Sequence, residues 1–353
     1  MSASSRAPAA TFSGLVDLAA ADLGGRALGA SDEFFAAADN LLQPARAVFL
    51  EGKFTERGKW MDGWESRRKR TSGRDAAHDW CLLALGAPGE IAGFDIDTQH
   101  FVGNHPSFAS VEGLWAPDAA DGAAALLARP GWVALLEQSP LRADAQNLFA
   151  AAPRGPVSHL RLNIFPDGGV ARFRAFGRVH PRWDAAPELD EETLIHVAPE
   201  LRDLAALANG GLTLACSDAF FGPMNNLLLP GRPADMGGGW ETRRRRGPGY
   251  DWILVKLGAR GAPLVVEVDT RHFKGNFPDR CSLQAIDAPA GTRITDLVGS
   301  DAWRELVPEA KLRADARHFF TVAAWSSSVT HLRLNIYPDG GVARLRVWGR
   351  PDA

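Results

Sequence analysis

Apolar and polar residues alternate over short runs along much of this 353-residue chain. Between His159 and Ile164, leucine or isoleucine occupies every second position. Residues two apart on a strand share a face, so this run predicts a strand with one apolar face. The turn sequence Pro-Asp-Gly-Gly follows at Pro166, and a second alternating run begins at Val170. Turn residues between two such runs are typical of a β-hairpin.

Helical periodicity is confined to short pieces, such as Asp121–Arg129 and Pro199–Ala208. Many short strands with turn signals between them are typical of a β-sandwich. The pattern therefore predicts an all-β fold.

The chain contains its main pattern twice. The twenty residues from His159 to Arg178 recur from His331 to Arg350, with sixteen identical positions at an offset of 172. This offset exceeds the roughly 20–50 residues of a solenoid repeat and indicates a duplicated domain. We therefore predict a disordered N-terminus over 1–13, a first sandwich over 14–178, a linker over 179–198 and a second sandwich over 199–353.

Matching blocks elsewhere locate two longer connections in the first half. The offset falls from 186 to 172 in two steps, between Leu42 and Trp60 and between Arg70 and Asp79. Insertions are tolerated best in surface loops, so both segments are predicted to be loops.

Composition and charge exclude several classes of partner. The net charge of −3 offers no basic excess for nucleic acid, and no apolar stretch reaches the length of a membrane span. The start of the chain does not resemble a signal peptide, and the three cysteines form no Cys-x-x-Cys motif. We therefore expect a cytoplasmic protein with free thiols that binds neither nucleic acid nor membrane.

The alternating strand carries a row of polar residues opposite its apolar face. These residues are His159, Arg161 and Asn163, repeated as His331, Arg333 and Asn335. A row of donors and acceptors on one face can bind a ligand. A solvated strand face would also explain it.

The repeated sequence Asp-Thr-x-His-Phe-x-Gly-Asn brings potential proton-transfer groups together. It contains Asp97, His100 and Asn104, repeated as Asp269, His272 and Asn276. A carboxylate close to a histidine can tune it for proton transfer, and asparagine at a turn can offer its amide to a ligand. A structural use of the carboxylates, by pairing with arginine or capping a turn, is the alternative.

A third repeated sequence places a glutamate before a run of basic residues. Glu65 and Arg67 recur as Glu241 and Arg243. Because arginine binds carboxylates in a bidentate manner, an anionic small substrate fits these runs. Internal pairing of the glutamates with the arginines is the structural alternative. No strong metal-binding spacing is present, although a divalent metal stays open.

Together, the sequences Trp-Glu-[Ser/Thr]-Arg-Arg, Asp-Thr-x-His-Phe-x-Gly-Asn and His-Leu-Arg-Leu-Asn-Ile-[Phe/Tyr]-Pro-Asp-Gly-Gly resemble the allantoicase family over about residues 14–350. The resemblance implies two tandem jelly-roll sandwiches of the discoidin or galactose-binding-like kind, assembled as a homo-oligomer. It also implies hydrolysis of allantoate to (S)-ureidoglycolate and urea in purine breakdown, with no evident cofactor.

Allantoate carries one carboxylate and two ureido groups, so this activity suggests roles for the repeated residues. General acid or base work is expected of His100, His272, Asp97, Asp269, Glu65 and Glu241. Substrate binding is expected of Arg67, Arg243, Asn104, Asn276, His159, Arg161, Asn163, His331, Arg333 and Asn335. Since fold does not determine function, the alternative is a non-catalytic pair of sandwiches that binds a ligand.

Overall fold

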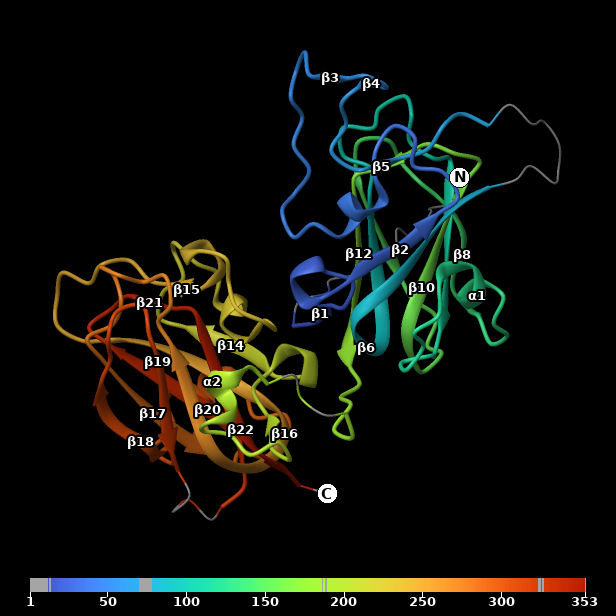
Figure 1. The fold of residues 1–353 in the computed structure, drawn as a ribbon. Coiled ribbons are helices and arrows are strands. Elements are labelled where there is room, and N and C mark those ends of the chain that lie inside the picture. The colour runs from blue at the N-terminus through green and yellow to red at the C-terminus, as the bar shows by residue number, and fades with distance from the viewer. Residues whose placement is uncertain are drawn as a thin grey trace, which may run out of the picture. The chain divides into compact units, whose positions relative to one another are not determined.

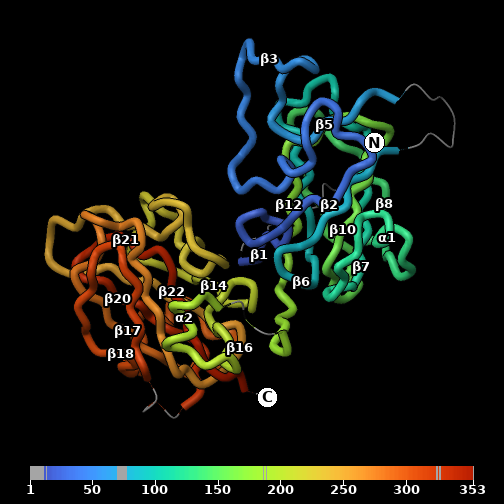
Figure 2. Tube along the Cα trace, viewed as in Figure 1, coloured from blue at the N-terminus to red at the C-terminus, as the bar shows by residue number. Residues whose placement is uncertain are grey.

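The computed structural model describes residues 12, 14–69, 78–185, 187, 189–322, 325 and 327–352. The chain divides into two compact units, Met1–His180 and Pro181–Ala353 (Figures 1 and 2). Residues 189–198, which the sequence analysis assigned to a linker, therefore fall within the second unit. The expected disordered start, residues 1–13, lies outside the described residues except for Phe12.

Both units consist mostly of strands. The first contains β1 (Val16–Asp17), β2 (Arg26–Ala30), β3 (Phe54–Thr55), β4 (Gly58–Lys59), β5 (Trp64–Glu65), β6 (Asp79–Asp97), β7 (Phe108–Leu114), α1 (Ala123–Leu127), β8 (Val133–Pro140), β9 (Gln146–Ala150), β10 (Pro156–Phe165), β11 (Gly169–Val170) and β12 (Arg172–Val179). The second contains α2 (Glu191–Leu194), β13 (Arg202–Asp203), β14 (Leu212–Cys216), β15 (Trp240–Glu241), β16 (Asp251–Asp269), β17 (Arg280–Ile286), α3 (Ile294–Val298), β18 (Arg304–Lys311), β19 (Arg317–Thr321), β20 (Val329–Tyr337), β21 (Gly341–Val342) and β22 (Arg344–Pro351).

One long strand builds the sandwich of the first unit. The first part of β6 pairs with β2 and β10, and its last part pairs with β9 and β12, all antiparallel. The register between β6 and β10 shifts between Ala84 and Gly89, and β6 crosses there from one layer of the sandwich to the other. The second unit repeats this arrangement with β16, which pairs with β14, β20, β19 and β22. The predicted all-β fold of two tandem jelly-roll sandwiches is confirmed.

The alternation of β10 divides its side chains as the sequence predicted. Leu160, Leu162 and Ile164 are fully buried between the layers. In the other layer, Phe94 and Phe173 stack with their ring centroids 5.7 Å apart. Burial of each such side chain contributes about 1.5–3 kcal/mol, which stabilises the sandwich.

The helical segments agree only in part with the prediction. The piece predicted at Asp121–Arg129 contains α1. The piece predicted at Pro199–Ala208 is not an α-helix, because it forms the edge strand β13 and enters a 3-10 turn at Leu207–Asn209. Its apolar residues Leu204 and Ala205 are buried against the sheet, so the interpretation of their spacing as helical was wrong.

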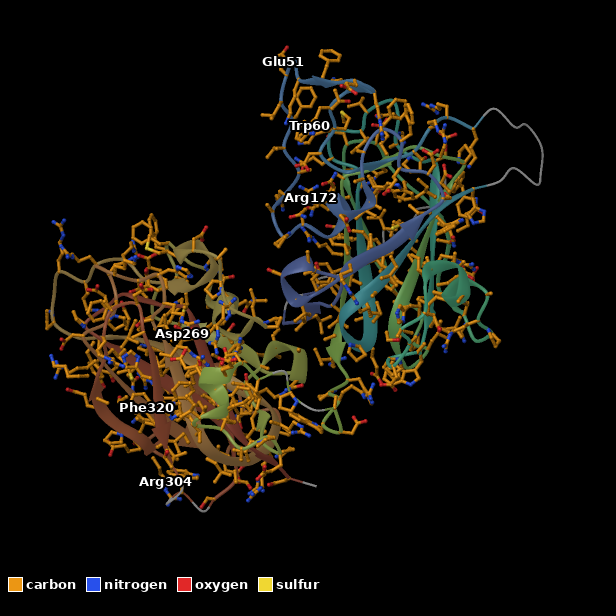
Figure 3. The ribbon with its side chains drawn as sticks, in the orientation of Figure 1. Glu51, Trp60, Arg172, Asp269, Arg304 and Phe320 are labelled. Atoms are coloured by element: carbon orange, nitrogen blue, oxygen red, sulfur yellow. The ribbon has the colours of Figure 1, made fainter. Side chains whose placement is uncertain are left out.

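Of the two loops predicted in the first half, 42–60 contains the short β3–β4 hairpin, which Figure 3 marks by Glu51 and Trp60. The other, between Arg70 and Asp79, lies almost entirely outside the described residues. No helix in the described part of the chain is both long and apolar enough to cross a membrane.

A close contact between Gly169 and Phe101 joins two of the repeated sequences. A Cβ atom at Gly169 would lie 1.9 Å from Cε1 of the fully buried Phe101. By contrast, a Cβ atom at Gly103 would meet no atom within 4 Å. The second unit has the same contact between Gly341 and Phe273.

We expect Gly169→Ala to destabilise the first unit by about 1–3 kcal/mol or more, because the added methyl overlaps a buried ring. The matched variant Gly103→Ala should leave the free energy of unfolding nearly unchanged. Urea unfolding followed by tryptophan fluorescence measures both. Equal stability of the two variants would contradict the described contact.

Candidate functional site

Three repeated sequences meet at one end of the first unit. Strand β5 pairs with β11, which places Glu65 opposite Gly169. The amide of Gly169 donates a 2.8 Å hydrogen bond to the carbonyl of Asn104. Ser66 and Gly168 complete the junction, since the amide of each donates to an oxygen of the other. Segments far apart in sequence are thereby held together through their backbones.

The second unit builds the same junction. Glu241 lies opposite Gly341, and the amide of Gly341 donates to the carbonyl of Asn276 at 2.8 Å. We call these two places the loop-end sites. They comprise Glu65, Arg68, Asn104 and Asp167 in the first unit, and Glu241, Arg244, Asn276 and Asp339 in the second.

A glutamate and an asparagine are hydrogen-bonded at each loop-end site. The Nδ2 of Asn104 donates to Oε1 of Glu65 at 2.7 Å, and Asn276 donates to Glu241 in the same way. Burial raises the pKa of Glu65 above its ordinary value, although the Asn104 hydrogen bond and the charge of Arg68 act in the opposite direction. A raised pKa favours the protonated form of this carboxyl group, which is the form that a general acid requires.

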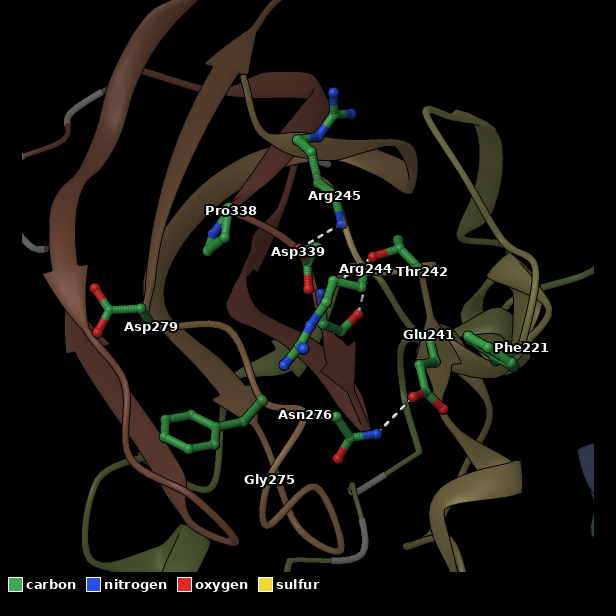
Figure 4. Close-up of a pocket in the computed structure, with 12 residues that line it drawn as sticks. Phe221, Glu241, Thr242, Arg244, Arg245, Gly275, Asn276, Asp279, Pro338 and Asp339 are labelled. Carbon is green, nitrogen blue, oxygen red and sulfur yellow. Dashed lines mark hydrogen bonds between the residues drawn. The ribbon is translucent and has the colours of Figure 1, made fainter. Parts of the chain in front are cut away.

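The loop-end site of the second unit opens into a cavity of about 510 Å³. In Figure 4 the side chain of Arg244 extends toward Asn276, whereas that of Arg245 extends the other way. The cavity is lined by Phe221, Glu241, Thr242, Arg244, Arg245, Gly275, Asn276, Phe277, Asp279, Pro338, Asp339 and Gly340.

Ion pairs distinguish the arginines of the basic run Arg243–Arg246 from one another. Arg243 pairs with Asp218 at 2.8 Å and covers the ring of Phe220, and Arg67 pairs with Asp32 in the same way. Arg245 pairs at 2.6 Å with the buried Asp251 at the start of β16. Arg244, which lies between them in sequence, has no ion pair within the described part of the chain.

The middle arginine is therefore a candidate that the sequence analysis missed. Arg67 and Arg243 were expected to bind substrate, but the described contacts commit both to aspartates, and Arg243 does not line the loop-end cavity. In the first unit, Arg68 donates to the carbonyl of Gly103 at 2.9 Å and lies 3.7 Å from Asp167. Consecutive arginines carry no signal in sequence that would reveal which of them is already paired.

The repeated histidines anchor a neighbouring segment. His100 and His272 have positive φ angles of 70° and 71°, and their amides donate to Asp144 and Asp315 at 2.7 Å. The ring Nε2 of His100 lies 3.2 Å from the carbonyl of Ala47. Because a carbonyl only accepts, Nε2 carries a proton in this contact. His272 does not line the loop-end cavity.

Asp97 and Asp269 lie on the outward face of the last part of β6 and β16. Oδ1 of each accepts a hydrogen bond at 2.8 Å from the amide two residues later, which caps the turn. Burial raises the pKa of both carboxyl groups. Figure 3 labels Asp269 and also Arg172, the register partner of Asp97 on β12.

The strand row expected to bind substrate is only partly brought together. Arg161 and Asn163 line a second cavity, of about 380 Å³, where Nε of Arg161 donates to Glu112 at 2.7 Å. His159 is buried apart from this cavity with its Nδ1 at 3.0 Å from the hydroxyl of Ser158, and burial lowers its pKa.

The counterpart in the second unit differs in charge. Gln284 occupies the position of Glu112, and Arg333 lies over the ring of Trp252 at 5.0 Å. Asn335 donates to Ser282 at 3.1 Å, as Asn163 does to Ser110. His331 resembles His159, with its Nδ1 at 2.8 Å from a hydroxyl, that of Thr330. The residues of the strand row are therefore repeated in both units, but the ion pair of Arg161 with Glu112 has no equivalent at Arg333 among the described residues.

Among the residues that the structure describes, no group of three or more histidine, cysteine, aspartate or glutamate side chains could hold a metal ion. The three cysteines form no disulfide, and burial raises the pKa of the Cys281 thiol to about 12. Within the described residues, the loop-end sites therefore contain neither a cysteine nor a recognisable set of metal ligands.

Fold and site together define a tandem duplication of one jelly-roll unit, with a carboxyl–amide pair and an arginine repeated at the loop end of each copy. Protein-family comparison finds the same duplication. The family described as "Allantoicase repeat" matches residues 16–180 and again 202–352.

Relatives match over almost the full length. "Probable allantoicase 1" of Burkholderia mallei is 46% identical, with 96% of this chain and 95% of the relative covered. "Probable allantoicase" of Rhizobium meliloti is 48% identical over 96% and 94%. The crystal structure of allantoicase from Saccharomyces cerevisiae is 35% identical, with a TM-score of 0.75 over 95% of this chain and 93% of that one. The chain belongs to the allantoicase family.

We expect Asn104→Ala to raise the pKa of Glu65 further, because it removes a hydrogen bond that favours the ionised carboxylate. The side-chain ¹³C shift of Glu65, followed by NMR as a function of pH, measures this. As a control, Asn209→Ala in the second unit should leave that titration unchanged. A fall in the pKa of Glu65 in Asn104→Ala would contradict the described hydrogen bond.

Proposed function

We propose that this chain hydrolyses allantoate to ureidoglycolate and urea in purine breakdown, and that the two loop-end sites carry the reaction. Membership in the allantoicase family supports the activity and does not favour a non-catalytic ligand-binding protein. The hydrogen-bonded Glu–Asn pair beside an arginine, repeated in both units, is the observation that carries the choice of site.

The chemistry of allantoate fits this set of side chains. Its carboxylate requires a cation, which Arg244 can provide because the described ion pairs leave that guanidinium uncommitted. Its ureido groups present N–H donors and a carbonyl acceptor. Glu241 can accept hydrogen bonds from the ureido N–H groups. The Nδ2 of Asn276 donates to Glu241 and so holds its carboxyl group in place.

Proton transfer at the glutamate accounts for the bond changes. In the proposed reaction the protonated carboxyl group gives its proton to the ureido nitrogen as the bond from that nitrogen to the central carbon breaks, and urea leaves. The resulting carboxylate accepts a proton from the water whose oxygen bonds to the same carbon. The glutamate ends protonated, and the products are ureidoglycolate and urea.

The remaining expectations also belong to this proposal. His100, His272, Asp97 and Asp269 contribute by positioning the segments around each site, since their described contacts are to backbone groups or to other side chains. The strand-face residues Arg161, Asn163, Arg333 and Asn335 form the rival site. Resemblance to the family supports a cytoplasmic homo-oligomer that needs no cofactor.

We expect Glu65→Gln and Glu241→Gln each to retain about half of the wild-type kcat for urea release, and the double variant to lose roughly 10²–10⁴-fold. Glutamine keeps the shape and the hydrogen bond but cannot donate a carboxyl proton. The matched variant Glu56→Gln removes an exposed carboxylate from the β3–β4 turn and should keep full activity. Complete loss in either single variant would indicate one shared site instead of two.

The strand-face rival is separated by Arg161→Ala and Arg333→Ala. If these variants fold and abolish turnover while the double glutamine variant remains active, the reaction occurs at the strand row. If they keep turnover and the double glutamine variant loses it, the loop-end assignment stands.

We expect urea release to persist after prolonged treatment with EDTA, because the proposed proton transfers require only side chains. Urea is quantified before and after treatment, with sodium chloride of equal ionic strength as the control. Loss of activity that a divalent ion restores would reveal a metal site and overturn this part of the proposal.

A further inference from the structure

The outward face of the last part of β16 binds two guanidinium groups. Oε1 of Glu267 accepts from Nε of Arg317 at 2.8 Å and from Nη1 of Arg232 at 2.7 Å. The same Nη1 also donates to Asp269 at 3.0 Å. Both carboxyl side chains have no exposed surface, and the guanidinium groups compensate their charges, although Oε2 of Glu267 has no hydrogen-bond partner in the described part of the chain.

The segment before β13 closes this face of the second unit. Nη1 of Arg317 contacts Asp190 at 2.9 Å and Glu192 at 3.0 Å, and the Arg317 side chain is fully buried. Asp190 also accepts from the amide of Thr193 at 2.8 Å and so caps α2. The guanidinium of Arg317 is thus enclosed between the sheet and α2.

The first unit lacks the central guanidinium. Arg317 stands opposite Asp269 in the sheet register, and the residue that stands opposite Asp97 is Gln146. Nε2 of Gln146 donates to Oδ2 of Asp95 at 2.7 Å. Asp95 is only 4% exposed, and its Oδ1 is buried with no hydrogen-bond partner.

The other cations around Asp95 are committed elsewhere or exposed. Arg174, its register partner on β12, donates to the carbonyls of Gln43 and Pro44, and Arg172 pairs with Asp62 at 2.9 Å. Arg46, the counterpart of Arg232, is exposed and forms no ion pair among the described residues, although its charge acts on both Asp95 and Asp97 to lower their pKa values.

No described residue of the first unit takes the place of Asp190, Glu192 and Thr193. The side chain of Gln146 is therefore exposed, and Leu148, two residues along the same strand, is 41% exposed. The Gln146 amide can move aside at the cost of one hydrogen bond.

In the first unit a neutral amide, that of Gln146, contacts Asp95, and Asp97 accepts from the backbone amide of Gln99, where the second unit supplies guanidinium groups. Burial, followed by the nearby charge of Asp97, raises the pKa of Asp95 to about 6. The Gln146 hydrogen bond and the charges of Arg174 and Arg46 act in the opposite direction. Within the described residues, Oδ1 of Asp95 is nevertheless left without a hydrogen bond, and a buried polar atom without a partner is costly.

We propose that the Asp95–Asp97 face of the first unit is a binding site for a small cation of the guanidinium class. Such a ligand would donate its planar N–H groups to Oδ1 of Asp95 and to Asp97, as Arg317 and Arg232 donate to Glu267 and Asp269. The same strand scaffold binds guanidinium in the second unit, which favours this class over an ammonium ion. The site shares Asp97 with the residues proposed to position the loop-end segments, but guanidinium binding to it does not depend on the proposed reaction.

The test is a calorimetric titration of the intact chain with guanidinium chloride in the millimolar range, below denaturing concentrations, against sodium chloride. We expect one saturable site in the wild type. Asp95→Asn should weaken binding at least about tenfold, because a charge-assisted hydrogen bond is lost. Gln146→Arg should abolish it, since the new side chain supplies the missing guanidinium from within the chain.

The exposed-carboxylate variant Glu56→Gln, also in the first unit, should bind as the wild type does. Circular dichroism and thermal unfolding establish that each variant is folded. If Gln146→Arg does not fold, the nearly isosteric Asp95→Asn decides alone. Wild-type affinity in folded Asp95→Asn, or a wild-type response no greater than that to sodium chloride, would overturn the proposal.

Discussion

The pairing of two very short strands is the constraint on which each loop-end site depends. Trp64 and Glu65 pair with Val170 and Gly169, and the fully buried Phe101 occupies the space that a side chain at Gly169 would need. The indole nitrogen of Trp64 adds a hydrogen bond of 2.9 Å to the carbonyl of Asp32. The Glu–Asn pair is therefore held by backbone pairing, a buried indole and a contact between a glycine and a ring. None of these uses the carboxyl group of Glu65 or the side-chain amide of Asn104.

Sequence pattern predicted the sandwich well because burial follows strand alternation. Leu160, Leu162 and Ile164 are buried as their spacing required, and the internal repeat located the second copy. The pattern was wrong at Pro199–Ala208, where apolar spacing compatible with a helix belongs to an edge strand and a 3-10 turn. Short apolar segments satisfy both periodicities, so only packing against the sheet distinguishes them.

Within the candidate site, the sequence proposes residue types and does not show how they pair. Glu65 and Asn104 were both proposed from their sequences, and their direct hydrogen bond joins segments 39 residues apart. The sequence also gives no sign that Arg67 is paired with Asp32, which lies 35 residues earlier in the chain. Ion pairs between distant segments leave no periodic trace in sequence, and they decide which charge is available to a ligand.

Comparison of the two units shows which features are common to the fold and which differ between its copies. The junction of Glu, Asn and glycine is the same in both units, down to the 2.8 Å amide–carbonyl bond that closes it. On the outward face, by contrast, Arg317 and Gln146 occupy equivalent register positions with different charge, although the strands beneath them are alike. A scaffold that tolerates either residue does not itself require the arginine. The difference between the copies therefore lies in what compensates the buried carboxylates: a guanidinium enclosed by α2 in the second unit, and an exposed amide in the first.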